Sequence, residues 1–127
     1  TTFDVRIGDT NLPCQKPPWG RLSAINTSTG DFAWQVPLGI TEQLPPEKQN
    51  TGRPVLAGPI ITASGLVFIA STDDNRFRAL DLKTGREMWV AKLPRRGNAD
   101  PITYQGKDGK QYVAVVATDT LMVYRIQ

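Results

Sequence analysis

The chain has 127 residues, which suits one domain with one core. Hydrophobic residues make up 39% and charged residues 21%, an ordinary soluble composition, and no apolar run approaches the roughly 18 residues of a transmembrane helix. The net charge of +3 is dispersed, without the basic stripe of a nucleic-acid interface. Ten prolines and eleven glycines argue against long helices.

The N-terminal stretch TTFDVRIGDT shows no basic segment followed by an apolar one, so no signal peptide is expected in the sequence as given. Its residues 3–7 alternate apolar and polar side chains, which predicts a strand. Cys14 is the single cysteine, so an intrachain disulfide is excluded. The chain has no histidine to act as the base of a cysteine nucleophile, and we expect Cys14 to be a buried or merely tolerated thiol.

Two windows repeat one pattern at an offset of 79 − 24 = 55 residues. Each window predicts a strand, a tight turn and a second strand. In the turns NTSTG and DLKTG the Asn or Asp can accept hydrogen bonds from the loop, and the glycine can adopt a positive φ. A small alanine across from each tryptophan leaves room for a neighbouring sheet to stack on the indole. The shared positions are Ala24, Asn26, Thr29, Gly30 and Trp34, then Ala79, Asp81, Thr84, Gly85 and Trp89.

The segment between the windows, residues 37–54, is rich in Pro, Gln, Glu and Lys and predicts an inserted surface loop. Residues 58–92 predict a four-stranded unit, in which residues 73–75 form a polar turn rather than a cation site. Successive four-stranded units with tryptophan-containing hairpins predict a radial all-β array. Three further strands are expected near residues 102–104, 111–118 and 121–126.

Other segments carry candidate binding chemistry. The densest positive charge is KLPRRG, residues 92–97, which we interpret as a solvated loop. Trp19 lies between two prolines and a glycine, where it could be a hydrophobic plug or an exposed stacking platform, and the plug is favoured. Trp34 and Trp89 are expected to be largely buried and structural, so that truncating Trp89 costs about 3–5 kcal/mol.

The second window, ALDLKTGREMW, resembles the tryptophan docking motif of quinoprotein dehydrogenases, which are β-propellers that use pyrroloquinoline quinone (PQQ). The resemblance runs from LPCQKPPWG to GKDGKQYV in the order of the membrane-bound PQQ glucose dehydrogenase type. It implies an all-β fold, a partial β-propeller of four-stranded antiparallel blades with tryptophan docking motifs. Residues 1–127 are then a single partial propeller domain of about two and a half blades. PQQ, calcium and a periplasmic or extracytoplasmic location are implied by this resemblance alone.

Two departures from the family bear on function. The family's catalytic Asp, its calcium ligands and most of its PQQ contacts lie in blades without a counterpart here, so no residue inherits a catalytic, cofactor-binding or metal-binding role. A Gly-rich loop that begins Gly-Gly-His in the glucose dehydrogenase type is replaced by a minimal turn at residues 118–120. We therefore expect the isolated chain to bind neither PQQ nor calcium tightly and to be inactive.

Three hypotheses follow: a fragment or truncated relative of a PQQ-dependent sugar or alcohol dehydrogenase, a non-catalytic propeller unit that binds partners as a scaffold, or a homo-oligomer that closes a ring. In each case the partners are other blades or copies of the chain, because a partial propeller exposes strand edges and tryptophan faces. Residues 121–126 are apolar on both faces, so we expect both to be covered. We also expect residues 3–7 to pair beside them, from a neighbouring copy rather than the same chain.

Overall fold

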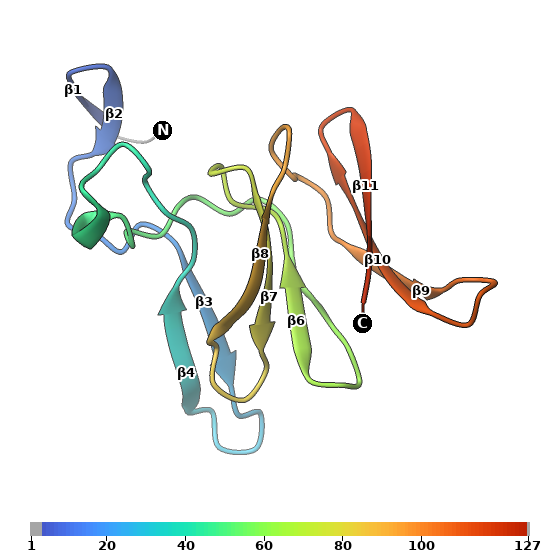
Figure 1. Cartoon of the computed structure of the whole chain (residues 1–127). Helices are drawn as coiled ribbons and strands as arrows, with labels where there is room; N and C mark the ends of the chain where they lie inside the picture. The colour runs from blue at the N-terminus through green and yellow to red at the C-terminus, as the bar shows by residue number, and fades with distance from the viewer. Residues whose placement is uncertain (1–3, 127) are drawn as a thin grey trace.

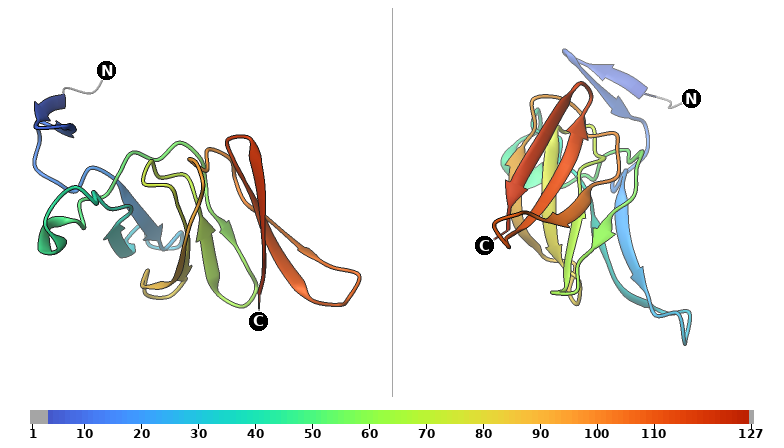
Figure 2. Two further views of the ribbon diagram at one scale, coloured as in Figure 1. Left: turned by 45° about the horizontal axis from the view of Figure 1, so that its top comes forward. Right: turned by 90° about the vertical axis from the view of Figure 1, so that its right-hand side faces the viewer.

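The structure is a computed structural model that describes residues 4–126, an all-β chain with one short 3-10 helix (Figure 1). Its strands form four antiparallel sheets of two, two, four and three strands in chain order. The last three sheets stand side by side, and the N-terminal hairpin lies apart from them (Figures 1 and 2). No helix in this part of the chain is long and apolar enough to cross a bilayer.

The N-terminal strand pairs with its neighbour in sequence. Strand β1 (Asp4–Ile7) is antiparallel to β2 (Thr10–Pro13), and Gly8 at a φ of 62° lies in the turn between them. The predicted pairing of this segment beside residues 121–126 is therefore wrong for residues 4–7, and Phe3 lies outside the described residues. A hairpin closes a much shorter loop than a pairing with a distant strand, and the entropic cost is correspondingly smaller.

The two repeated windows form equivalent hairpins, as predicted. In each hairpin the alanine lies opposite the tryptophan, and the register shifts just after the alanine. The strands are β3 (Arg21–Ile25) with β4 (Phe32–Pro37), and β7 (Arg76–Asp81) with β8 (Glu87–Lys92).

Both turns use side-chain oxygens to bind the loop backbone. Asp81 Oδ1 accepts hydrogen bonds from the Thr84 backbone N–H at 2.8 Å and from the Thr84 hydroxyl at 2.9 Å. Asn26 Oδ1 accepts from the backbone N–H two residues on at 2.9 Å. Gly30 and Gly85 have φ angles of 80° and 72°, which a residue without a Cβ adopts at little cost. The hydrogen bonds from Thr84 hold the pKa of Asp81 below its usual value.

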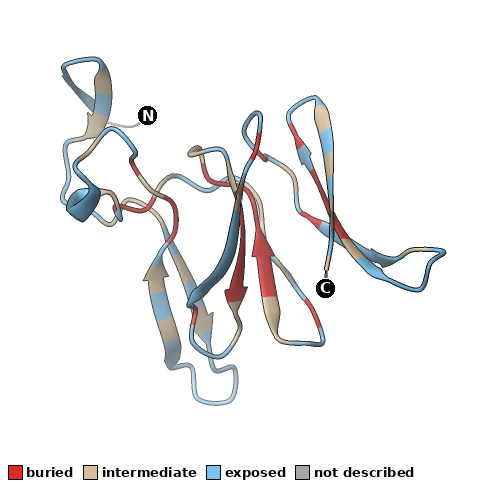
Figure 3. Ribbon diagram, in the orientation of Figure 1, coloured by how far each residue is buried: buried red, intermediate tan, exposed pale blue. Residues whose placement is uncertain are grey.

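The central sheet has four strands in the order β5-β6-β7-β8, as predicted for residues 58–92. Its inner strands are buried along nearly their whole length because sheets cover both faces (Figure 3). The last sheet has the order β11-β10-β9, which confirms three further strands. The remaining bounds are β5 (Ile60–Ile61), β6 (Leu66–Ile69), β9 (Ile102–Gln105), β10 (Gln111–Ala117) and β11 (Thr120–Arg125).

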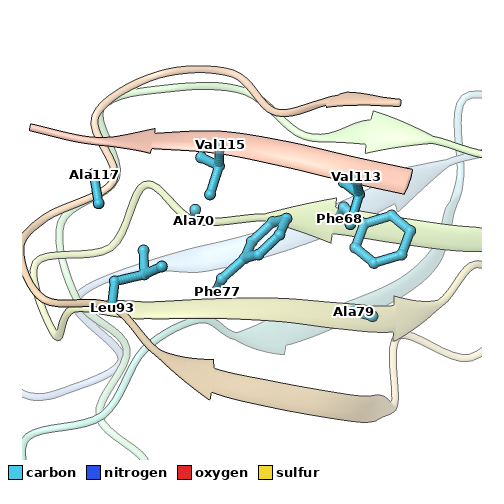
Figure 4. Close-up of a cluster of buried hydrophobic side chains, with 8 residues drawn as sticks. All are labelled: Phe68, Ala70, Phe77, Ala79, Leu93, Val113, Val115 and Ala117. Atoms are coloured by element: carbon cyan, nitrogen blue, oxygen red, sulfur yellow. The ribbon is translucent and has the colours of Figure 1, made fainter. Parts of the chain in front are cut away.

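Two hydrophobic clusters hold the three sheets together. Phe68 and Phe77 of the central sheet pack with Val113 and Val115 of the last sheet (Figure 4). A second cluster lies on the side of the β3–β4 hairpin and contains Leu38, Val67, Ile69 and Leu80. Consecutive residues of β6 therefore enter different clusters, as the alternation of side chains along a strand requires.

Strand β11 packs by one face only among the described residues. Tyr124 and Ile126 pack against the first cluster, whereas Leu121 is 64% exposed and Val123 45% exposed. The expectation that both faces are covered is wrong in this structure, because the last sheet has no neighbouring sheet on its outer face within residues 4–126.

Trp34 binds the next copy of the repeat. Its Nε1 donates a hydrogen bond to the carbonyl oxygen of Leu82 at 2.8 Å. Its ring covers Gly85 so closely that a Cβ on this glycine would lie 2.6 Å from Trp34 Cε3. The stacking predicted between successive copies therefore occurs, with Trp34 half-buried in the contact.

Trp89 is less buried than predicted. It is 38% exposed, and its ring meets Phe77 and Tyr124 edge-on, with centroids 5.8 and 5.1 Å apart. The reason is that no further glycine turn covers it within the described residues, as Gly85 covers Trp34. Truncating Trp89 should therefore cost less than the roughly 3–5 kcal/mol of a fully buried tryptophan.

Candidate functional site

Three connections meet at one end of the sheets, at the top of Figure 1. They are the segment 38–59 between β4 and β5, the β6–β7 turn and the segment 93–101 between β8 and β9. An isolated bridge between Val55 and Thr72 joins the first two, and the Ser71 hydroxyl donates to the Ala57 carbonyl at 2.8 Å. This loop end therefore gathers side chains from distant parts of the sequence.

The segment predicted as a surface loop is folded against the sheets. Its only regular element is the 3-10 helix η1 (Pro46–Lys48), but Leu38, Thr41 and Thr51 are buried. The hydroxyls of the two threonines lie 2.7 Å apart and share a hydrogen bond. The segment is therefore anchored by buried residues although its composition is polar, and its tip is exposed.

Glycines place Arg53 at this end. A Cβ on Gly20 would lie 2.0 Å from the Arg53 carbonyl oxygen, and one on Gly52 would lie 2.1 Å from the Gly20 carbonyl oxygen. Only residues without side chains allow backbones to approach so closely. The chain before β3 and the chain before β5 are therefore held together, which fixes where the Arg53 side chain begins.

Arg53 forms a two-point ion pair with Asp73 of the β6–β7 turn. Its Nε lies 2.5 Å from Asp73 Oδ1 and its Nη2 lies 2.6 Å from Asp73 Oδ2. Both side chains are mostly buried, at 20% and 15% exposure. The hydrogen bonds to Asp73 raise the pKa of Arg53 above its usual value.

The adjacent Asp74 is buried with Arg78, and each side chain is only 3% exposed. The Asp74 carboxylate also accepts hydrogen bonds from the Thr72 hydroxyl at 2.6 Å and from the backbone N–H of Ile40 at 2.9 Å. Burial alone would raise the pKa of Asp74, but the guanidinium of Arg78 and these donors lower it. The carboxylate ties the inserted segment to the central sheet.

A cavity of about 290 Å³ opens beside the Arg53–Asp73 pair. Its polar lining includes Asn11 of β2 and Asn98 and Arg96 of the β8–β9 connection. The Arg96 side chain is 56% exposed, and its Nη2 lies 3.9 Å from Asp73 Oδ2, beyond hydrogen-bond distance. Residues with guanidinium, carboxylate and amide side chains thus line one small space, a combination that suits a polar ligand.

The residues singled out in the sequence fall unevenly around this cavity. Asp73 lines it, as a member of the polar turn that was predicted. Trp19 does not line it: that side chain is half-buried and donates from Nε1 to the Gln15 carbonyl at 2.8 Å. Cys14 is exposed rather than buried. The charged residues of the basic loop, Lys92, Arg95 and Arg96, are exposed as predicted, whereas Leu93 and Gly97 are buried. Arg96 also borders the cavity.

The cavity beside the Arg53–Asp73 pair does not offer the groups that PQQ with its metal needs. PQQ is a planar, anionic tricycle that needs a stacking surface and cationic groups, and its calcium needs a cage of oxygen ligands. No group of three or more His, Cys, Asp or Glu residues within residues 4–126 could hold a metal ion. The nonpolar walls of the cavity are Pro13, Pro54 and Leu56, which offer no aromatic ring.

Sequence reasoning missed Arg53 as a member of this site. Its partner lies 20 residues away, and the approach depends on backbone contacts between Gly20 and Gly52. The run Thr51-Gly52-Arg53-Pro54 after a polar loop was the available signal, since a glycine there suggests close backbone approach.

Comparison with known proteins agrees with this fold. Residues 2–113 match the family model of the glucose/ethanol/alcohol dehydrogenase β-propeller domain. The chain is 43% identical over 113 residues to the quinate/shikimate dehydrogenase (quinone) of Acinetobacter baylyi, and 39% identical over 122 residues to the quinoprotein glucose dehydrogenase of Escherichia coli. These alignments cover 84% and 91% of this chain but only 14% and 15% of those two proteins.

Solved structures give the same architecture. A europium-containing methanol dehydrogenase has a TM-score of 0.59 and 35% identity, over 75% of this chain and 14% of that one. BamB from Moraxella catarrhalis has a TM-score of 0.56 over 98% of this chain and 31% of that one, and its 19% identity shows the fold alone. The partial propeller that the resemblance implied is confirmed, and the chain belongs to the glucose/ethanol/alcohol dehydrogenase β-propeller family of quinoproteins.

Proposed function

We propose that the chain contributes blades to a larger PQQ-dependent dehydrogenase propeller that oxidises a hydroxylated substrate outside the cytoplasm. The identity to dehydrogenases named for quinate, glucose and glycerol carries this proposal, because it extends over most of the chain. The contact of Trp34 with Gly85 supports it as a docking contact between blades. The central sheet is one complete blade, and the sheets beside it are parts of two others.

The remaining blades are the partners that fit the exposed surface. On the outer face of β11, Leu121 is 64% exposed and Val123 is 45% exposed, and a further sheet packed on this face would cover them. A scaffold role has weaker support, since the likeness to BamB is one of fold. Homo-oligomerisation is the alternative, and light scattering on the purified chain distinguishes a monomer from a closed ring.

We predict that the isolated chain has no dehydrogenase activity. It lacks a described metal cage, and its loop-end cavity has no aromatic wall for PQQ. The purified chain, mixed with PQQ, calcium and glucose or quinate, should reduce an electron-accepting dye no faster than the mixture without protein. Dye reduction that depends on both PQQ and the chain would contradict this.

A chimera tests the proposed function directly. The part of this chain that aligns with the Acinetobacter baylyi quinate/shikimate dehydrogenase, 84% of its length, would replace the matched segment of that enzyme. We expect PQQ-dependent, quinate-driven dye reduction within about tenfold of the parent, a loss of no more than about 1.4 kcal/mol in transition-state stabilisation. The same exchange with the matching part of BamB is the control and should abolish activity. A folded chimera that binds PQQ but is inactive would refute the proposed function.

A further inference from the structure

We propose that the loop-end cavity binds a small hydroxylated carboxylate and that Arg96 holds its carboxylate group. The inference rests on the proposed function, since it names the substrate class of the dehydrogenase. It rests on the charges of the lining residues, on the loosely paired guanidinium of Arg96 and on the volume of the cavity.

The charges around the cavity disfavour a polyanionic ligand. Arg53 and Asp73 neutralise one another through two hydrogen bonds of 2.5 and 2.6 Å. Of the other charged residues in the lining, Arg96 is positive and Asp4 is negative. A lining with no excess of positive charge disfavours polyanions such as nucleotides, whereas one arginine suffices for one carboxylate.

Arg96 is the guanidinium that can bind this carboxylate. Its backbone is fixed, because the Thr118 hydroxyl donates to the Arg96 carbonyl at 3.1 Å and a Cβ on Gly97 would lie 2.7 Å from the Ala70 carbonyl oxygen. Its side chain is nevertheless more than half exposed and stands 3.9 Å from Asp73, the longest ion pair among the described residues. An arginine with an anchored backbone and a loosely paired guanidinium suits ligand binding.

The neighbouring Arg95 does not belong to the cavity. It is 63% exposed, and its Nε lies 3.6 Å from Asp119 Oδ1 of the β10–β11 turn. It is absent from the lining, whereas Arg96 is part of it. Two adjacent arginines of similar exposure therefore differ in whether they reach the ligand, which provides a matched control.

The other polar groups suit hydroxyls. Asn11 and Asn98 line the cavity, and an asparagine side chain can both donate and accept hydrogen bonds. The Asp73 carboxylate is oriented by Arg53 and retains acceptor capacity, because two carboxylate oxygens offer about four lone-pair sites. Neighbouring hydroxyls of a polyol need such a mixture of donors and acceptors.

The size of the cavity limits the ligand. A volume of about 290 Å³ lies at the low end of the roughly 300–1,000 Å³ typical of small-molecule sites. Pro54 and Leu56 form nonpolar walls, and Leu56 is 73% exposed, so it presents an apolar surface to the CH groups of a small ring. A hydroxylated cyclohexane carboxylate such as quinate has this size and polarity.

Calorimetric titration of the isolated chain with three probes tests the proposal without any cofactor. Quinate carries both a carboxylate and hydroxyls, inositol carries hydroxyls alone, and cyclohexanecarboxylate carries the acid alone. We expect quinate to bind with a Kd on the order of 1 mM, and the other two at least about fivefold more weakly. Arg96→Ala should weaken quinate binding at least about fivefold, while Arg95→Ala leaves it unchanged. Arg96→Lys should restore part of the affinity, since lysine keeps the charge but not the two-point geometry.

Three results would overturn the proposal: no quinate binding, equal binding of inositol, or equal losses for Arg95→Ala and Arg96→Ala. Unchanged melting temperatures of both variants would show that they remain folded. If quinate does not bind but the chimera is active, the site is wrong and the proposed function stands. If quinate binds as expected but a folded, PQQ-loaded chimera is inactive, the proposed function fails on its own.

Discussion

Replacing Arg78 by Leu is expected to lower the free energy of unfolding by about 3–5 kcal/mol, the usual result of removing one partner of a buried ion pair. Arg78 and Asp74 are each only 3% exposed, and Arg78 Nη1 also donates to the Thr72 hydroxyl at 2.9 Å. The substitution leaves the Asp74 carboxylate buried without its countercharge. Chemical denaturation at neutral pH measures the loss.

Two comparisons identify the cause. Lys92→Leu removes a lysine of the same sheet that is 72% exposed and pairs with the half-exposed Glu42 at 3.1 Å, and it should cost about 1 kcal/mol or less. The double variant Arg78→Leu/Asp74→Leu removes both buried charges and should recover much of the loss, because well-packed apolar replacements of a buried pair are often neutral. A double variant as unstable as Arg78→Leu would show that the pair's charges are not the reason.

The stabilisation by the Arg78–Asp74 pair should depend on pH, with a sign that follows from the pKa of Asp74. Arg78 and the other donors hold the pKa of Asp74 below its usual value, so the pair stabilises the fold above the unfolded pKa of about 3.9. This contribution is lost as the pH falls through the folded pKa. In Arg78→Leu burial remains without the opposing charge, so the pKa of Asp74 should rise. The difference in stability between the wild type and this variant should therefore shrink as the pH is lowered from 7 toward 4.

Local chemistry in the sequence was sufficient to predict the hairpins. Asn26 and Asp81 mark turns because their side chains bind the next backbone N–H groups, and the glycines that follow supply a positive φ. These contacts lie within a few residues of one another, so a short window contains all of them. The same holds for the turn at residues 73–75.

Long-range contacts could not be predicted in this way. The alternating pattern of β1 predicts a strand but does not identify the strand with which it pairs. It pairs with β2, because a hairpin closes the shorter loop. The repeat indicated that a neighbouring sheet stacks on each tryptophan, but not that the turn at Gly85 makes this contact with Trp34. Whether a further turn covers Trp89 depends on other blades. The Arg53–Asp73 pair depends on a backbone contact between Gly20 and Gly52, which the glycines alone do not reveal.

Gly85→Ala is expected to lower the free energy of unfolding by about 2–5 kcal/mol, from two separable sources. The left-handed backbone at a φ of 72° costs an alanine about 1–2 kcal/mol. A Cβ there would also lie 2.6 Å from Trp34 Cε3, so the indole must move, and overpacking of this kind costs about 1–3 kcal/mol. Moving the ring also strains the Nε1 hydrogen bond to Leu82.

Gly30→Ala separates the two sources, because Gly30 holds the equivalent position in the first window. Its φ is 80°, yet a Cβ there would have no atom within 4 Å. This variant should show the backbone cost alone, about 1–2 kcal/mol, with the emission of Trp34 unchanged. In Gly85→Ala the loss should be larger, and the tryptophan emission should shift as the ring leaves its site. Equal losses in the two variants, with unchanged emission in both, would mean that Trp34 does not couple the two sheets and that the repeat stabilises each hairpin separately.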